Sequence, residues 1–79
     1  MPYDNAVTGR IIRRLRLEKG LSQDVLSGLA GIGRSHLAMI EAGSKNANVE
    51  TLWRISEALE IRLSHLIYSV EAEIFEDQN

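Results

Sequence analysis

Residues 21–43 read LSQDVLSGLAGIGRSHLAMIEAG. Ser22 is a favourable N-cap, and apolar residues at helical spacing follow it, so the first part of this stretch predicts a helix of about two turns. The residues expected on its buried side are Val25, Leu26, Leu29 and Ala30. Gly31 and Gly33 then permit a sharp change of chain direction, with Ile32 packed between them into the core.

A second short helix is expected over residues 34–42, where Leu37 and Ile40 point inward and Gly43 ends the helix. The residues left facing outward on it are Arg34, Ser35, His36, Ala38 and Met39. Two short helices joined by a tight glycine turn form a helix-turn-helix, here over residues 22–42, whose second helix enters the major groove of DNA. The motif therefore predicts a DNA-binding protein.

Three further helices are predicted around this motif. Apolar residues at helical spacing indicate the first over residues 5–19, and Gly20 ends it. Asn48 is the expected N-cap of the next helix, whose apolar stripe is formed by Val49, Leu52, Ile55, Ser56 and Leu59. The last helix is expected over residues 63–76. Because no segment alternates polar and apolar residues as a strand does, we expect an all-α, compact five-helix fold with a single domain over residues 1–79.

The composition narrows the functional classes. With 79 residues, 44% of them hydrophobic and 25% charged, the chain makes one small soluble domain, a size that often gains stability from a partner chain. It contains no cysteine, which excludes disulfides and thiolate metal sites, and no metal site is expected. The longest apolar runs are a few residues, which predicts neither a membrane span nor a secretory signal and places the chain in the cytoplasm.

The net charge of −2 is unevenly distributed. Residues 1–48 contain seven Lys or Arg and four Asp or Glu, whereas residues 49–79 contain two and seven. A basic first half suits the phosphate backbone of DNA, and an acidic second half would face away from it. An equally acceptable interpretation is that these charges only cover two solvated faces.

Segments along most of the chain form a longer pattern. They are RRLRLEKGLSQ at 13–23, Leu26 and Ala30, HLAMIEAG at 36–43, NVETL at 48–52, and then Ile55, Ala58 and Leu59. In this order and spacing, over about residues 7–67, the chain resembles the Xre-type, or lambda-repressor-like (Cro/C1-type), helix-turn-helix transcriptional regulators. It departs from the family at Gly33, where Ser or Thr is favoured as N-cap, and at Glu60, where the family has glycine.

The resemblance implies roles for individual residues. Gln23, which begins the first helix of the motif, falls where the family binds a DNA phosphate, at a helix N-terminus that attracts anions. Further contacts to the DNA backbone fall on Ser44, Lys45 and Asn46. The base-reading positions are Arg34, Ser35, His36 and Met39. A structural ion pair falls on Arg16 and Glu41.

Several of these positions admit a second interpretation. Arg34 is the best candidate for direct readout, because a guanidinium can fork onto the O6 and N7 atoms of guanine. His36 could instead be a solvated helix residue, and Met39 could pack against Trp53 instead of facing a base. Trp53 and Tyr68 are interpreted as core or interface residues, and neither a small-molecule ligand nor a cofactor is expected.

The helix expected over residues 63–76 is apolar on more than one side. Its residues assigned to the domain's own core are Leu63, Leu66 and Val70. The candidate dimer interface consists of Ile67, Tyr68, Ile74 and Phe75. One reading helix covers only about half a turn of DNA, so we expect a two-fold homodimer whose half-sites lie ~34 Å apart. In the alternative, this helix folds back entirely over its own domain.

These features predict a homodimeric regulator that binds a pseudo-palindromic operator and controls its own gene, as restriction–modification controller proteins and phage-type repressors do. RNA polymerase is then a candidate partner, blocked or recruited at the promoter. Two alternatives are an antitoxin-type regulator and a protein-interaction module that has kept the fold without DNA binding. An enzyme is not expected, because no residue stands in a nucleophile or phosphate-loop motif, and His36 and His65 are too far apart for a helical metal pair.

Overall fold

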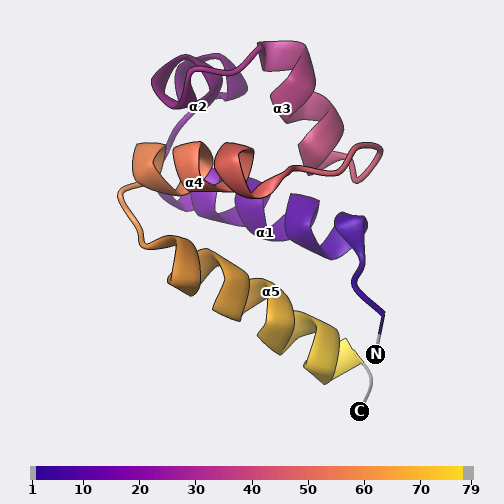
Figure 1. Ribbon diagram of the computed structural model, residues 1–79. Helices are drawn as coiled ribbons and strands as arrows, with labels where there is room; N and C mark the ends of the chain where they lie inside the picture. The colour runs from indigo at the N-terminus through magenta and orange to yellow at the C-terminus, as the bar shows by residue number, and fades with distance from the viewer. Residues whose placement is uncertain (1, 78–79) are drawn as a thin grey trace.

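The computed structural model of the protein describes residues 2–77, which form five helices and, within that range, no strand (Figure 1). The helices are α1 (Asn5–Glu18), α2 (Gln23–Ala30), α3 (Arg34–Glu41), α4 (Val49–Ala58) and α5 (Leu63–Asp77). The ends of α1, α3 and α5 lie within one residue of the predicted bounds, and the all-helical prediction is confirmed. None of these helices is long and apolar enough to cross a membrane.

Polar side chains fix where three of the helices begin. The Asp4 carboxylate accepts a hydrogen bond from the Ala6 amide at 2.9 Å, and the Ser22 hydroxyl accepts one from the Val25 amide at 3.1 Å. Asn48 accepts from the Thr51 amide at 2.8 Å. Each such cap satisfies an otherwise unpaired amide and contributes about 1 kcal/mol. The predicted caps at Ser22 and Asn48 are thus present.

Four of the helices are followed by a residue in the left-handed region, which comes directly after α2 and one residue later after α1, α3 and α4. Three of these residues are glycines, Gly20, Gly31 and Gly43, with φ of 72°, 70° and 78°. The fourth is Glu60, with φ of 61°. A residue with a Cβ pays roughly 1–2 kcal/mol in this conformation, so the departure from glycine that the sequence shows at position 60 is accommodated with backbone strain.

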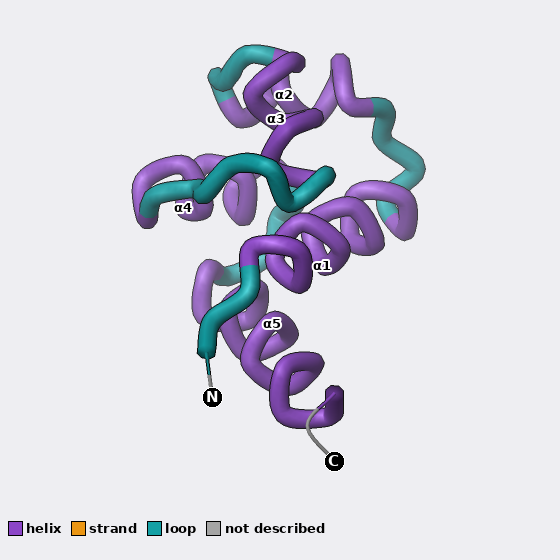
Figure 2. The backbone as a smooth tube through the Cα atoms, turned by 90° about the vertical axis from the view of Figure 1, so that its right-hand side faces the viewer, coloured by secondary structure: helices purple, strands orange, loops and turns teal. Residues whose placement is uncertain are grey.

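The helices place the motif at one end of the molecule. Helix α1 packs against both α3 and α5, while α2 packs against α3 and α4. Both views of the backbone show α2 and α3 at one end and α5 at the other, with α1 and α4 between them (Figures 1 and 2). The helix-turn-helix is therefore supported from one side only, and its far side is open.

Aliphatic side chains from all five helices form one continuous core. Its most completely buried large side chains are Ile11, Ile12, Leu26, Leu37, Ile40, Ile55, Leu59 and Leu66. Burial of each stabilises the fold by roughly 1.5–3 kcal/mol. Ile32 is half-buried against this core, as predicted for the turn. A close approach of α1 to α3 at Gly9, where a Cβ would lie 2.5 Å from the Glu41 carbonyl oxygen, fixes the position of α3.

Three residues predicted on buried helix sides lie on the surface: Val25, Leu29 and Val49 are 48%, 63% and 70% exposed. On α2, Leu26 and Ala30 are buried as predicted, and the third buried residue is Ser27. Trp53 is 55% exposed, so of its two interpretations the core is wrong and the interface stays a prediction.

Candidate nucleic-acid interface

The outer face of α3 carries the residues predicted to read bases. The Arg34 side chain, at the first position of the helix, is 66% exposed, and Ser35 is also exposed. Met39 is 41% exposed, whereas His36 is only half-exposed. The opposite face is fixed in the core by Leu37 and Ile40, so the outer face has a defined orientation.

Glycine at the N-cap leaves the first turn of α3 open. Gly33 makes no side-chain cap bond, and its φ of −69° is one that any residue can adopt. A Cβ at this position would meet no atom within 4 Å. The amides of the first turn therefore face outward beside Arg34, without the side-chain partner that α2 and α4 have.

Arg34 is paired across the turn with an acid from α2. Its Nε lies 3.3 Å from Oδ1 of Asp24, and the two side chains are 66% and 72% exposed. No role was predicted for Asp24 from the sequence. The two residues are ten positions apart in the sequence. They meet because the turn brings the start of α2 next to the start of α3, so no local sequence pattern predicts the contact.

A buried ion pair ties α1 to the end of α3. The Glu41 carboxylate accepts from Arg16 Nε at 2.7 Å and from Arg16 Nη2 at 2.9 Å, with the two side chains 3% and 8% exposed. Arg16 Nη1 also donates to the Leu21 carbonyl at 2.9 Å. The hydrogen bond to Glu41 raises the pKa of the Arg16 guanidinium, which stays charged. Among the described residues, no buried side-chain nitrogen or oxygen lacks a partner.

Gln23 is attached to this ion pair. Its amide nitrogen, Nε2, donates to Glu41 Oε1 at 3.1 Å, and the side chain is half-buried at the start of α2. An amide nitrogen carries two hydrogens, so one is used on Glu41 and the other is left for an acceptor outside the domain. The residue expected at a phosphate is thus held in place by the protein itself.

The loop between α3 and α4 divides into an anchored and an exposed part. Ser44 donates both its amide and its hydroxyl hydrogen to the Met39 carbonyl, at 3.0 and 3.2 Å, and so completes the end of α3. Lys45 and Asn46 follow and are exposed. A phosphate contact from the Ser44 hydroxyl requires that hydroxyl to turn away from Met39, whereas Lys45 and Asn46 are directly accessible.

The arginines of α1 are partly matched by acids. Arg10 Nη2 lies 3.1 Å from Glu73 Oε2 of α5, and Arg14 Nε lies 3.7 Å from Glu18 Oε2 one turn later. The Arg10–Glu73 contact joins the basic first half of the chain to its acidic second half, whereas the Arg14–Glu18 contact lies within α1. Arg34 lies on α3 itself, Lys45 lies in the loop that follows α3, and Arg54 Nη1 of α4 reaches the Gly31 carbonyl at 3.4 Å, in the turn before α3.

The residues predicted for dimerisation lie on α5. Ile67, Tyr68 and Phe75 are 44%, 67% and 51% exposed, while Ile74 is half-buried against the core. Leu66 and Val70 are buried and Leu63 packs partly against the core, as expected. Helix α5 therefore covers its own domain with one side and exposes apolar residues on another.

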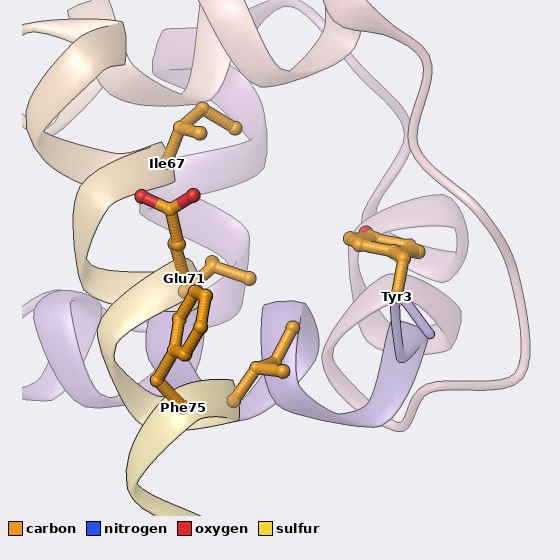
Figure 3. Close-up of a pocket in the computed structure, with 6 residues that line it drawn as sticks. Tyr3, Ile67, Glu71 and Phe75 are labelled. Atoms are coloured by element: carbon orange, nitrogen blue, oxygen red, sulfur yellow. The ribbon is translucent and has the colours of Figure 1, made fainter. Parts of the chain in front are cut away.

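An apolar groove of about 500 Å³ runs along this exposed side of α5 (Figure 3). Tyr3 faces Phe75 across it, and its hydroxyl is 2.5 Å from Thr8 Oγ1. Tyr3 was not predicted to take part, since a residue before the first helix has no periodicity to mark it. A second groove, of about 620 Å³, includes Trp53 and shares Ile67 with the first.

Comparison with known proteins identifies the family and its sequence relatives. The helix-turn-helix family model matches residues 12–66. Control protein C.MunI from Mycoplasma sp is 35% identical over 66 residues, which cover 82% of this chain and 89% of that protein. The HTH-type transcriptional regulator y4dJ of Sinorhizobium fredii is 33% identical over 61 residues, covering 77% of this chain and 79% of that protein.

A solved structure extends the likeness to three dimensions. The restriction-modification controller protein C.AhdI from Aeromonas hydrophila has a TM-score of 0.77 and 34% sequence identity, covering 78% of this chain and 94% of that one. The family model spans the helix-turn-helix and α4, beginning within α1 and ending in the first turn of α5. The chain therefore belongs to the helix-turn-helix family of transcriptional regulators.

Proposed function

We propose that this protein binds double-stranded DNA sequence-specifically, as a homodimer on a pseudo-palindromic operator, with α3 in the major groove. The observation that carries the proposal is the outer face of α3. It is clear of the core, begins with an exposed Arg34 and lies beside a Gln23 that is already fixed to Glu41. The geometry suits a helix that meets base edges at its N-terminal end.

The contacts divide into two kinds. Base readout is assigned to Arg34, Ser35, His36 and Met39. Backbone contacts are assigned to Gln23, Ser44, Lys45 and Asn46. Phosphate contacts supply affinity and set the register, whereas base contacts supply discrimination. Arg34 is the principal reader, because its terminal nitrogens can fork onto guanine.

The charge distribution supports this orientation. Helix α5, at the far end from α2 and α3, carries the acids Glu71, Glu73 and Glu76 (Figure 1). A negative far end disfavours encounters in which that end meets DNA, and so steers the motif toward the groove.

Helix α5 is the proposed dimer contact. Its apolar residues Ile67 and Phe75 are half-exposed, and Tyr68 is more exposed still, while Ile74 forms part of the groove wall. A two-fold interface uses the same patch on both copies. An apolar surface of this kind, on a domain that has only a small core, favours pairing with a second copy.

The relatives suggest which kind of regulator this is. C.MunI is a control protein and C.AhdI a restriction–modification controller. We assign the chain to this kind of regulator, acting on its own promoter in the cytoplasm without enzymatic activity, with RNA polymerase blocked or recruited there.

The test is a fluorescence anisotropy titration with labelled DNA from upstream of the protein's own gene and with a scrambled duplex, each at two salt concentrations. We expect saturation at two chains per site, a preference for the upstream DNA, and a salt slope near −0.9 per neutralised phosphate. Weak binding without preference would contradict autoregulation. Absence of binding at low salt would contradict DNA binding itself and favour a protein-interaction module.

The dimer is tested separately with Ile67→Glu. A glutamate in the centre of an apolar contact should give a monomer by light scattering and weaken operator binding, because each copy then binds a half-site alone. Leu17→Glu is the matched control, since Leu17 is 54% exposed on α1, away from the groove residues. Equal effects of the two variants, or an unchanged dimer mass, would contradict the interface.

A further inference from the structure

The contact between Asp24 and Arg34 differs from the two exposed ion pairs within single helices on either side of the motif. Arg14–Glu18 and Arg54–Glu50 each join residues four apart on one helix, at 3.7 and 3.6 Å. Asp24–Arg34 joins the two helices of the motif across the turn, at 3.3 Å. We propose that Asp24 is a specificity-determining residue, which positions the Arg34 guanidinium toward a base and away from phosphates. This inference rests on the proposed base readout by Arg34.

The geometry determines which edge of the guanidinium is available. A guanidinium is planar and presents its five N–H donors in a fixed fork. Because the Asp24 carboxylate lies against Nε of Arg34, the edge formed by Nη1 and Nη2 is the one left to point outward. That edge has two parallel donors, which match the O6 and N7 acceptors of guanine. Asp24 thus favours one orientation of the flexible Arg34 side chain, with the Nη edge facing outward.

The pair contributes little to folding. Both side chains are about two-thirds exposed or more, at 66% and 72%, and an exposed ion pair is screened by water and salt. An acid in the first turn of α2 is favoured by the helix dipole, but this does not account for its pairing with an arginine of α3. A role in DNA binding accounts better for the pairing of Asp24 with Arg34.

On DNA, the carboxylate discriminates against the wrong contact. If Arg34 turned to a phosphate, Asp24 would lose its counter-charge beside a negative backbone. If Arg34 reads a guanine with its Nη edge, the carboxylate keeps its partner. Specificity can arise from such a penalty on competing complexes as well as from a favourable contact in the correct one. Asp24 therefore weakens binding to random DNA more than binding to the operator.

The test uses Asp24→Asn and two duplexes, one enriched by the wild-type protein from a random-sequence pool and one scrambled. Anisotropy titrations over a range of salt give the specificity ratio, the dissociation constant for scrambled DNA divided by that for enriched DNA. We expect the ratio to fall roughly five-fold, the upper end of what an exposed ion pair supplies. The salt slope on scrambled DNA should steepen by about 0.9, because Arg34 gains a phosphate.

Three variants isolate the cause. Glu50→Gln removes an acid at the same position of α4, the second residue after the N-cap, with 77% side-chain exposure and its own arginine partner. It should shift both dissociation constants together and leave the ratio unchanged. Asp24→Glu keeps the charge within reach of Arg34 and should retain most of the ratio. In an Arg34→Ala background, Asp24→Asn should change neither the ratio nor the slope.

The outcomes separate this inference from the proposed function. If Asp24→Asn tightens both duplexes equally, Asp24 is only a repulsive charge and the inference is wrong, while DNA readout stands. The same holds if Asp24→Asn still lowers the ratio after Arg34 is removed. If the wild-type protein enriches no sequence from the pool, the proposed DNA readout is wrong and the inference with it. Circular dichroism confirms that each variant is folded.

Discussion

Glu41→Gln is the substitution with the largest expected effect on stability. The change preserves the shape of the side chain but removes its charge and replaces one acceptor oxygen with an amide. In the native protein the carboxylate accepts three hydrogen bonds, at 2.7, 2.9 and 3.1 Å, from Arg16 and Gln23. After the change, Arg16 is left as a buried cation, 8% exposed, facing a neutral group that can satisfy only part of its donors.

The size of the effect follows from that burial. Removing one partner of a buried ion pair costs roughly 3–5 kcal/mol, because the other charge stays buried and uncompensated. A domain of 79 residues has a free energy of unfolding of about 4–12 kcal/mol, so the loss is a large fraction of the total. The melting temperature should fall by about 12–40 °C, since each 1 kcal/mol shifts it by roughly 4–8 °C in a domain of this size.

Urea denaturation followed by circular dichroism at 222 nm measures this loss directly. The control is Glu18→Gln, whose pair with Arg14 is exposed at 52% and 63% and should cost under about 0.5 kcal/mol. The paired replacement Arg16→Met with Glu41→Leu should be less harmful than Glu41→Gln alone, because no unpaired charge is left. A loss below about 1 kcal/mol for Glu41→Gln, or a paired replacement at least as unstable, would refute the reasoning.

The pH dependence of this pair also has a defined sign. Folding raises the pKa of Arg16, so the stabilisation from the guanidinium is fully present below its ordinary, unfolded pKa. It is lost only as the pH rises through the higher pKa of the folded state, in strongly alkaline solution. Titration of Arg16 therefore adds no pH dependence to stability near neutrality.

The remaining predictions concern the backbone and the reading helix. Gly9→Ala should destabilise the fold by about 1–3 kcal/mol in a thermal melt, because its Cβ would meet the backbone of α3; an unchanged melting temperature would show that α1 and α3 can separate freely. Glu60→Gly should raise stability by about 0.5–1 kcal/mol in urea, since it relieves the left-handed strain at φ 61°, and a loss would indicate an unrecognised contact of that side chain. Arg34→Ala should weaken operator binding by about 1–3 kcal/mol and relax specificity at one base pair, whereas a uniform loss on all DNA would contradict base readout.

The fold could be predicted from the sequence because polar N-cap residues and glycines mark where most helices begin and end. Ser22 and Asn48 cap their helices, and glycines supply most of the left-handed residues that end them. The direction of α2 was harder to predict. At about 100° per residue, the buried residues Leu26, Ser27 and Ala30 span one side of α2, and Val25 and Leu29 lie roughly 100° or more from the middle of that side. The prediction was right for Leu26 and Ala30 and wrong for Val25 and Leu29, because it counted apolar residues and passed over Ser27.

The residues of the candidate site could be predicted only in part from the sequence. The positions of Arg34, Gln23 and Lys45 come from register within the family pattern; the structure has Arg34 at the start of α3, Gln23 at the start of α2 and Lys45 in the loop after α3, and their contacts to DNA stay predictions. The partner of Arg34 could not be predicted, because Asp24 reaches it only through the three-dimensional turn. The place of Tyr3 in the α5 groove could not be predicted either, because Phe75, which lines the same groove, lies at the other end of the chain.

The hydrogen bond from Gln23 to Glu41 also bears on the thermodynamics of association. Immobilising a free glutamine side chain costs roughly 1.5–2 kcal/mol of rotamer entropy. Here the loss occurs when the domain folds, so it is absent from the free-energy change on meeting DNA. If Gln23 binds a phosphate as proposed, its contact is preorganised, and binding at this position should show a smaller entropic penalty in calorimetry than an unanchored glutamine would.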